Sequence, residues 1–338
     1  MNPTTAERPA CLMVMFDDAR RSEVFPSEIL SAVAARTQLL HPPMTVHELD
    51  ARTELLARVE VLFTSWGAPR LDEARLQAAP LLRAVFHAGG TVRTFMTEAA
   101  WQRGLIVSSA SSLNALPVAE YALAVILFSL KDGWHYVAGA KRDGRMPPRR
   151  AMAGAYQSCV GLVSLGEIAR RLVALLRAHD IELLLHDPTV DADEADRLGL
   201  QLVSLDELFA RCDVVSLHTP LLPSTRGMVG RELLQRMKPG ATFINTARGA
   251  LVREADLIDT LRERPDLTAI LDVIADEPLD AGSALLALPN LHLTPHIAGS
   301  IGRECLRLAR GMVDELDRWL NGKPLRWQVR AERRHLIA

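Results

Sequence analysis

The chain has 338 residues, 49% hydrophobic and 24% charged, a composition typical of a globular protein with two domains. Its 39 Lys and Arg residues face 41 Asp and Glu residues, and this balance leaves no basic surplus for binding nucleic acid or an anionic membrane. The longest apolar run, residues 121–128, is too short to span a bilayer, and residues 1–10 lack the pattern of a signal peptide, so we expect a cytoplasmic protein.

Short apolar runs alternate with helical patterns through the first third of the chain. The expected strands are residues 11–16, 59–65, 81–90 and 105–110. The helices between them are expected at residues 25–40, 72–79 and 97–104. Strands and helices that alternate at this spacing indicate parallel βαβ units, and therefore a first α/β domain over about residues 1–112.

A long apolar helix is predicted at residues 117–142, and a second βαβ series follows it. Its expected strands are residues 159–165, 181–187, 213–220, 241–247, 267–274 and 291–299. A final amphipathic helix is predicted at residues 302–322. The fold class is therefore α/β, with two doubly wound parallel-sheet domains.

The four cysteines show no spacing typical of a metal or redox site. We expect buried free thiols and no metal. The four positions are Cys11, Cys159, Cys212 and Cys305.

Residues 164–169 read S-L-G-E-I-A, between a predicted strand and a predicted helix. A dinucleotide-binding turn usually reads G-x-G-x-x-G in this context. Gly166 lies where the backbone must let a pyrophosphate approach the helix N-terminus, and Ala169 is small enough for the third glycine position. Ser164 departs from the pattern, because a Cβ strains the tight turn that the first glycine allows.

Asp187 ends the next predicted strand, 18 residues after Ala169. An acid at this point hydrogen-bonds a ribose diol and repels a 2′-phosphate, so NAD is favoured over NADP. The alternative is an Asp that caps the turn before Pro188.

Three polar residues follow neighbouring predicted strands: Arg248, Glu277 and His296. The carboxyl ends of parallel strands are where open α/β sheets bind ligands. A histidine held by a carboxylate can take the hydroxyl proton of an alcohol as hydride leaves, and an arginine can pair with the substrate's own carboxylate. Singly, each has a structural alternative, as a surface arginine, a strand-ending acid or a buried histidine.

The chain resembles the NAD-dependent D-2-hydroxyacid dehydrogenase family, which includes phosphoglycerate, glyoxylate/hydroxypyruvate and D-lactate enzymes. The resemblance rests on "VVSLHTPLLPSTRGMVGRELLQRMKPGATFINTARGALV", "LDVIADEP", "LTPHIAGS" and "NALPVAE". It implies a Rossmann nucleotide domain, residues 113–296, inserted into a flavodoxin-like substrate domain, residues 1–112 plus 297–338. It also implies a homodimer formed through the nucleotide domain.

By this resemblance Arg248, Glu277 and His296 are the catalytic residues, and the substrate is a small 2-hydroxy or 2-oxo acid. The residues implied to bind the cofactor are Gly166, Glu167, Ile168, Asp187, His218, Thr246, Ala247, Asp272, Ala298 and Gly299. The residues expected at the substrate are Trp66, Thr91, Val92 and Arg93.

The substrate loop departs from the family's G-x-G-x-D, since it reads "GTVRT" at residues 90–94. Arg93 adds a cation that either meets a second anionic group or faces solvent. Trp66 either covers a bulky substrate side chain or packs its loop onto its own domain. Two other functions stay open: oxidation of phosphite or another anion on the same fold, and NAD(H) sensing without catalysis.

Overall fold

A computed structural model of the protein describes residues 8–16 and 19–332. The chain divides into two compact units. Unit 1 comprises Met1–Asn114 and Ser300–Ala338, and unit 2 comprises Ala115–Gly299. The domains predicted from the sequence have their boundaries after residues 112 and 296.

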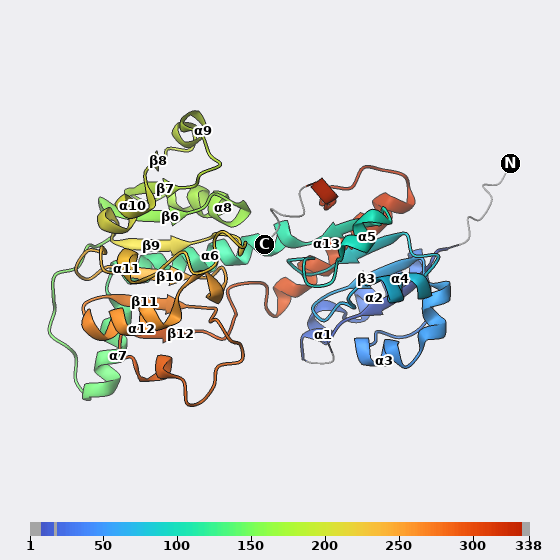
Figure 1. The fold of residues 1–338 in the computed structure, drawn as a ribbon, viewed down its shortest axis with the longest axis horizontal. Helices are drawn as coiled ribbons and strands as arrows, with labels where there is room; N and C mark the ends of the chain where they lie inside the picture. Colours follow the sequence, from blue (N-terminus) through green and yellow to red (C-terminus); the bar gives the residue numbers. More distant parts are fainter. Residues whose placement is uncertain (1–7, 17–18, 333–338) are drawn as a thin grey trace. The chain divides into compact units, whose positions relative to one another are not determined.

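Unit 1 contains a five-stranded sheet within the described residues, and its strands are blue to blue-green in Figure 1. They are β1 (Ala10–Val14), β2 (Gln38–Leu39), β3 (Val61–Thr64), β4 (Ala84–His87) and β5 (Ile106–Ser109). All neighbours pair in parallel, in the order β2-β1-β3-β4-β5. This is the strand order of a flavodoxin-like domain, as predicted.

Helices cover both faces of this sheet because successive strand residues point to opposite sides. They are α1 (Ala19–Val24), α2 (Ser27–Arg36), α3 (Val46–Asp50), α4 (Glu73–Ala78), α5 (Glu98–Gln102) and α13 (Arg303–Leu320), with a 3₁₀ helix, η1 (Thr53–Arg58). Cys11 and Met13 share a core with α2 and α13, whereas Leu12 and Val14 share the other core with α3, α4 and α5. The final amphipathic helix therefore completes the core of unit 1.

Unit 2 contains a seven-stranded sheet (Figure 1). Its strands are β6 (Ser158–Val163), β7 (Ile181–His186), β8 (Gln201–Leu202), β9 (Val214–Leu217), β10 (Thr242–Asn245), β11 (Thr268–Leu271) and β12 (Leu291–Leu293). All pairs are parallel, in the order β12-β11-β10-β9-β6-β7-β8. The order reverses between β6 and β9, which is the switch point of a Rossmann sheet.

The helices of unit 2 again lie on two faces. They are α6 (Ser111–Leu130), which begins in unit 1, α7 (Gly133–Asp143), α8 (Glu167–Leu176), α9 (Ala192–Arg197), α10 (Leu205–Arg211), α11 (Arg231–Leu234) and α12 (Glu254–Glu263), with 3₁₀ helices η2 (Gly249–Leu251) and η3 (Ala284–Ala287). Val160 and Leu162 of β6 pack with α6 and α8, and Val163 packs with α10, α11 and α12. The predicted fold class of two parallel-sheet α/β domains is confirmed.

The predicted single helix over residues 117–142 is wrong in two respects. The helix begins at Ser111 and contains Pro117, and it ends at Leu130. Asp132, with φ 52°, adopts a left-handed conformation that separates α6 from α7. Helix α6 is long and apolar enough to cross a membrane, but half of its apolar window is buried in the protein core.

The cysteine prediction is confirmed, because all four thiols are free and buried. The Sγ atom of Cys159, on β6, lies 3.4 Å from the Sγ atom of Cys212, at the end of α10.

Candidate active site

The site residues predicted in unit 2 follow the carboxyl ends of β6, β7, β9, β10, β11 and β12. Because these strands are parallel, their carboxyl ends lie along one edge of the sheet. His218, just after β9, donates its backbone N–H to Val163 O at the end of β6, at 3.0 Å. The switch point of the sheet is therefore where the nucleotide turn and the end of β9 meet.

Ser164 has a φ of 74°, in the region that glycine adopts without strain. Its backbone N–H donates to His186 O at 2.8 Å, and its hydroxyl donates to Thr219 Oγ1 at 3.1 Å. The turn thus has the geometry of the first glycine of the motif, and two hydrogen bonds hold the serine in it.

Gly166 is the N-cap of α8, with φ −75° and ψ −171°, a conformation that any residue can adopt. A Cβ built on it has no atom of the described chain within 4 Å. Neither backbone conformation nor packing within the protein therefore requires glycine here, whereas the close approach of a ligand would. The amides of Glu167 and Ile168 open the helix beside it, where backbone N–H groups lack intrahelical acceptors.

Ala169 is fully buried in the core between α8 and the sheet, so it performs the packing task of the third glycine. Asp187, just after β7, accepts the Leu165 N–H on Oδ2 at 2.7 Å. Its Oδ1 accepts the backbone N–H and the hydroxyl of Thr189, at 2.8 and 2.7 Å. Asp187 therefore ties the nucleotide turn to the end of the neighbouring strand, and it also caps its own turn.

Two buried polar atoms lie at the ends of adjacent strands. Nδ1 of His218, after β9, and Oγ1 of Thr246, after β10, have no hydrogen-bond partner in the part of the chain that the structure describes. Nε2 of His218 is 2.9 Å from Ser216 Oγ, and burial lowers the pKa of this histidine to about 4. The Nδ1 atom of this neutral imidazole and the Thr246 hydroxyl are polar atoms that a bound cofactor can satisfy.

The turn that carries Arg248 is held by Asn245, which is fully buried at the end of β10. Its amide donates to Arg248 O at 2.9 Å, and its carbonyl oxygen accepts the Ala247 N–H at 2.9 Å. A Cβ on Gly249 would lie 1.9 Å from the carbonyl carbon of Ile274, so only glycine lets these two segments touch. The Arg248 turn therefore packs directly on the loop that leads to Glu277.

Glu277 and His296 form the pair predicted from the sequence. Nδ1 of His296 lies 2.9 Å from Glu277 Oε2, and Glu277 Oε1 accepts the Ile274 N–H at 3.4 Å. Both side chains are about half exposed: the His296 side chain is 52% exposed and that of Glu277 is 40% exposed. The carboxylate accepts a hydrogen bond from the Nδ1–H group. This leaves Nε2 as the nitrogen that can exchange a proton with a substrate.

Asp272, at the end of β11, is 2% exposed and holds the loop that carries His296. Its Oδ1 accepts the Ile297 N–H, and its Oδ2 accepts the Ala298 N–H, both at 2.8 Å. Its backbone oxygen accepts the His296 N–H at 3.0 Å. The predicted cofactor residue Asp272 therefore also has a clear structural task, and Gly299 follows directly in the same loop.

The substrate residues predicted in unit 1 lie after β3 and β4. Trp66 is partly buried against the core of unit 1, with the Arg20 guanidinium 5.6 Å from its ring centre, which supports the packing alternative. Val92 is 1% exposed and belongs to the core, so only its backbone can face a substrate. Arg93 is exposed and donates its backbone N–H to Thr91 Oγ1 at 3.2 Å.

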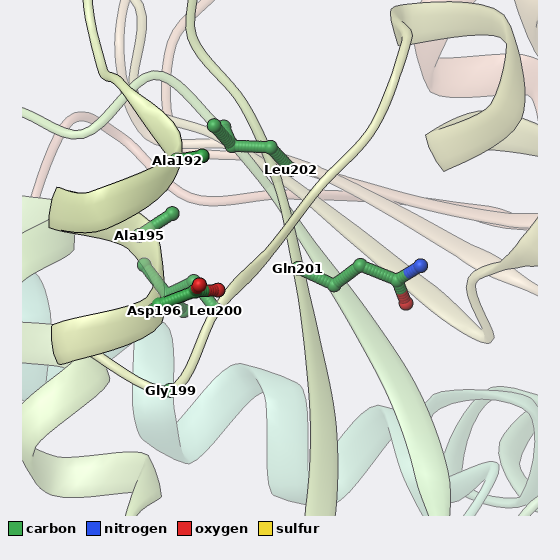
Figure 2. A pocket seen from close by; sticks show the side chains of 7 residues that line it. All are labelled: Ala192, Ala195, Asp196, Gly199, Leu200, Gln201 and Leu202. Carbon is green, nitrogen blue, oxygen red and sulfur yellow. The ribbon is translucent and has the colours of Figure 1, made fainter.

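A cavity of about 430 Å³ lies between α9 and β8. Figure 2 shows Ala195 and Asp196 from the helix and Leu202 from the strand around it. None of the predicted site residues lines it. Among the described residues, no group of three His, Cys, Asp or Glu side chains is placed to hold a metal ion.

Three further residues hold the site together and were not predicted from the sequence: Asn245, Thr219 and Thr294. Thr219 accepts a hydrogen bond from the Ser164 hydroxyl, and the Thr294 hydroxyl donates one to Asp272 Oδ1 at 2.7 Å. Each of the three is a polar residue at the end of an apolar strand, within two positions of a predicted site residue. That pattern was the available signal.

Comparisons with known proteins give the family of the chain. The family model described as "D-isomer specific 2-hydroxyacid dehydrogenase, NAD binding domain" matches residues 124–298. The chain belongs to this family. NAD is therefore the cofactor of unit 2.

Among the relatives of this family member, an (S)-sulfolactate dehydrogenase of Chromohalobacter salexigens is 36% identical over 277 residues, covering 80% of this chain and 89% of the relative. A D-3-phosphoglycerate dehydrogenase of Mycobacterium leprae is 35% identical over 254 residues, covering 74% of this chain. The match covers 47% of that relative, so the family member spans about half the length of the phosphoglycerate dehydrogenases it resembles. The crystal structure of the TT0316 protein from Thermus thermophilus aligns with a TM-score of 0.77 at 29% identity, covering 94% of this chain and 99% of that one.

Proposed function

We propose that the protein transfers hydride reversibly between NAD and a small 2-hydroxy or 2-oxo acid. The observation that carries the proposal is the His296 Nδ1–Glu277 Oε2 contact of 2.9 Å at the same sheet edge as the nucleotide turn. Membership of the family favours the D configuration of the hydroxy acid.

In the reduction, His296 donates its Nε2 proton to the oxygen on C2 of the 2-oxo acid, and that oxygen becomes a hydroxyl. In the oxidation, Nε2 takes the hydroxyl proton back. Glu277 keeps the ring oriented and stabilises the imidazolium that forms. Bound NAD⁺ would accept the hydride that leaves C2 in the oxidation, and bound NADH would supply it in the reduction.

Arg248 has the task of pairing with the substrate's carboxylate, for which the guanidinium fork is suited. In the protein its Nη1 donates to Ala247 O at 2.6 Å, which orients the side chain within its own turn. Gly166, Glu167 and Ile168 would face the pyrophosphate, and Asp187 would face the ribose. The proposed contacts at the nicotinamide end are His218, Thr246, Ala247, Asp272, Ala298 and Gly299.

The substrate is proposed to carry a second acid group. Two relatives are named for phosphoglycerate and sulfolactate, and both names specify a second acid. Arg93 is the exposed cation in the predicted substrate loop, beside Thr91. Replacing Arg93 by Gln should raise KM about tenfold for a 2-oxo acid with a second anion and leave KM for a monoacid unchanged. Arg58→Gln, on η1 before β3, is the matched control.

The test of the function is NADH oxidation with a panel of 2-oxo acids, with and without a second acid group, beside NAD reduction by phosphite. Turnover of a 2-oxo acid supports the proposal. Turnover of phosphite, with no turnover of any 2-oxo acid, would show instead that the protein oxidises phosphite. NADH binding without any turnover, with a change of oligomeric state, would favour a sensing role.

The assembly proposed is a cytoplasmic homodimer formed through unit 2, without nucleic-acid or membrane partners. Sedimentation velocity of the purified protein tests it, and a monomer at micromolar concentration would contradict it.

A further inference from the structure

The loop that carries His296 adopts a conformation that its own sequence does not favour. His296 has a φ of 55°, and a non-glycine residue holds such a conformation only where its surroundings impose it. The imposed position matters for catalysis, because a small displacement of a proton-transfer group slows a reaction strongly.

Asp272 imposes this conformation through three hydrogen bonds to the loop, from the N–H groups of His296, Ile297 and Ala298. Two of them end on the carboxylate, so their strength depends on where that carboxylate is held. At 2% exposure it cannot be solvated by bulk water, and protein donors must hold it.

Thr294 provides one such donor, since its hydroxyl oxygen lies 2.7 Å from Asp272 Oδ1. The Thr294 hydroxyl oxygen also lies 2.7 Å from the Tyr121 hydroxyl oxygen. Thr294 has one hydroxyl proton, which it donates to the carboxylate, so Tyr121 is the donor in the second hydrogen bond. The chain of donors therefore runs from Tyr121 through Thr294 to Asp272.

Tyr121, the first donor in this series of hydrogen bonds, is held in place by packing. It lies on α6 and packs against the core between α6, α8 and the sheet of unit 2. Burial raises the pKa of its phenol, which keeps the proton that it donates.

We propose that Tyr121 and Thr294 are positioning residues, which fix the loop of His296 by orienting the Asp272 carboxylate. Neither residue is needed to touch the substrate. The inference rests on the proposed dehydrogenase activity only for its kinetic test, since the conformation of the loop can be measured without turnover.

Thr294→Val removes the hydroxyl and keeps the shape of the side chain. We expect kcat to fall roughly tenfold to a hundredfold. The Kd for NADH should rise by a smaller factor, because Asp272 and Ala298 are also proposed contacts of the nicotinamide. Thr294→Ser restores the hydroxyl and should recover most of kcat. Tyr121→Phe removes the hydrogen bond to Thr294, which is one step further from Asp272, and kcat should fall roughly threefold to tenfold.

Two matched controls separate positioning from general loss of stability. Thr260→Val removes a fully buried hydroxyl of α12 that has no partner among the described residues. Tyr136→Phe removes a phenol of α7 that accepts the Arg150 N–H at 3.0 Å. Both should leave kcat unchanged.

Amide hydrogen exchange over residues 294–299, read by mass spectrometry, gives the second measurement. Exchange should be faster in Thr294→Val and Tyr121→Phe than in the parent and both controls, and Thr294→Ser should resemble the parent. If Thr294→Val changes neither exchange nor kcat more than Thr260→Val does, the inference is overturned. If the parent reduces no 2-oxo acid, the proposed function fails, and the exchange measurement still decides whether Tyr121 and Thr294 position the loop.

Discussion

The nucleotide turn and the catalytic loop each contain a non-glycine residue in the left-handed region, but the two are held differently. Ser164, with φ 74°, is held by a backbone hydrogen bond to His186 and a hydroxyl contact with Thr219. His296, with φ 55°, lies in a loop that one buried carboxylate residue binds three times.

The difference follows from what each residue must do. The first position of the turn needs only a backbone that bends, and glycine would do this at lower cost. Residue 296 must present an imidazole, so glycine cannot replace it. Neighbouring residues therefore have to stabilise its strained backbone. Strain at Ser164 can therefore be removed without loss, whereas strain at His296 belongs to the site.

The largest expected effect is at His296, where side chain and backbone can be separated. His296→Ala should lower kcat by about 10²–10⁴-fold, because the proton-transfer group is lost. Binding of NADH, measured by calorimetry, should change less than about threefold. His296→Asn tolerates the left-handed conformation and should be equally inactive. An Asn variant with near-normal turnover would show that the backbone, and not the ring, is what the loop provides.

Gly166→Val places a side chain in the open space beside the turn, where the pyrophosphate is proposed to bind. We expect NADH to bind at least about a hundredfold more weakly, because the valine would block the pyrophosphate. The fold should persist, since a Cβ at this position contacts nothing and φ is −75°. The affinity of Gly166→Ala for NADH should lie between those of the parent and Gly166→Val. If Gly166→Val binds NADH as well as the parent does, the turn is no phosphate site.

Asp187 serves both the turn and the proposed ribose contact, and two substitutions separate these roles. Asp187→Ala should weaken NADH binding about tenfold and reduce the preference for NADH over NADPH. Both the acceptor for the Leu165 N–H and the negative charge are lost in this variant. Asp187→Asn keeps an acceptor for Leu165 and removes only the charge. Fluorescence titrations with both cofactors should show a gain in NADPH binding relative to NADH for both variants. An unchanged ratio of the two affinities would place the selectivity elsewhere.

Ser164→Gly has the smallest expected effect and sharpens the comparison most directly. The glycine removes strain on the order of 1 kcal/mol, so NADH should bind equally well or up to about tenfold more tightly. Ser164→Ala keeps the strained Cβ but loses the hydroxyl bonded to Thr219, and it should bind no better than the parent. Equal gains in both variants would mean that the hydroxyl, and not the strain, weakens binding.

The two-sheet fold could be predicted because the parallel strands are continuous apolar runs that alternate with amphipathic helices. Boundaries were less predictable. Residues 37–40 were expected to continue a helix, yet Gln38–Leu39 form the edge strand β2, because pairing with β1 outweighs local helical preference. The break at Asp132 was missed because the helical pattern was continued across Asp132 and Gly133, although an Asp-Gly dipeptide favours a turn.

The sequence by itself determined the kinds of residue available for the chemistry and the strand end that each one follows, since in a parallel sheet all strand ends share one edge. Only the tertiary structure decided which of them meet: the contact between His296 and Glu277, the approach of the Arg248 turn to Ile274, and the chain from Tyr121 to Asp272. These contacts join residues up to 173 positions apart in the chain. They depend on loop conformations and hydrogen bonds between strand ends, which periodicity does not encode.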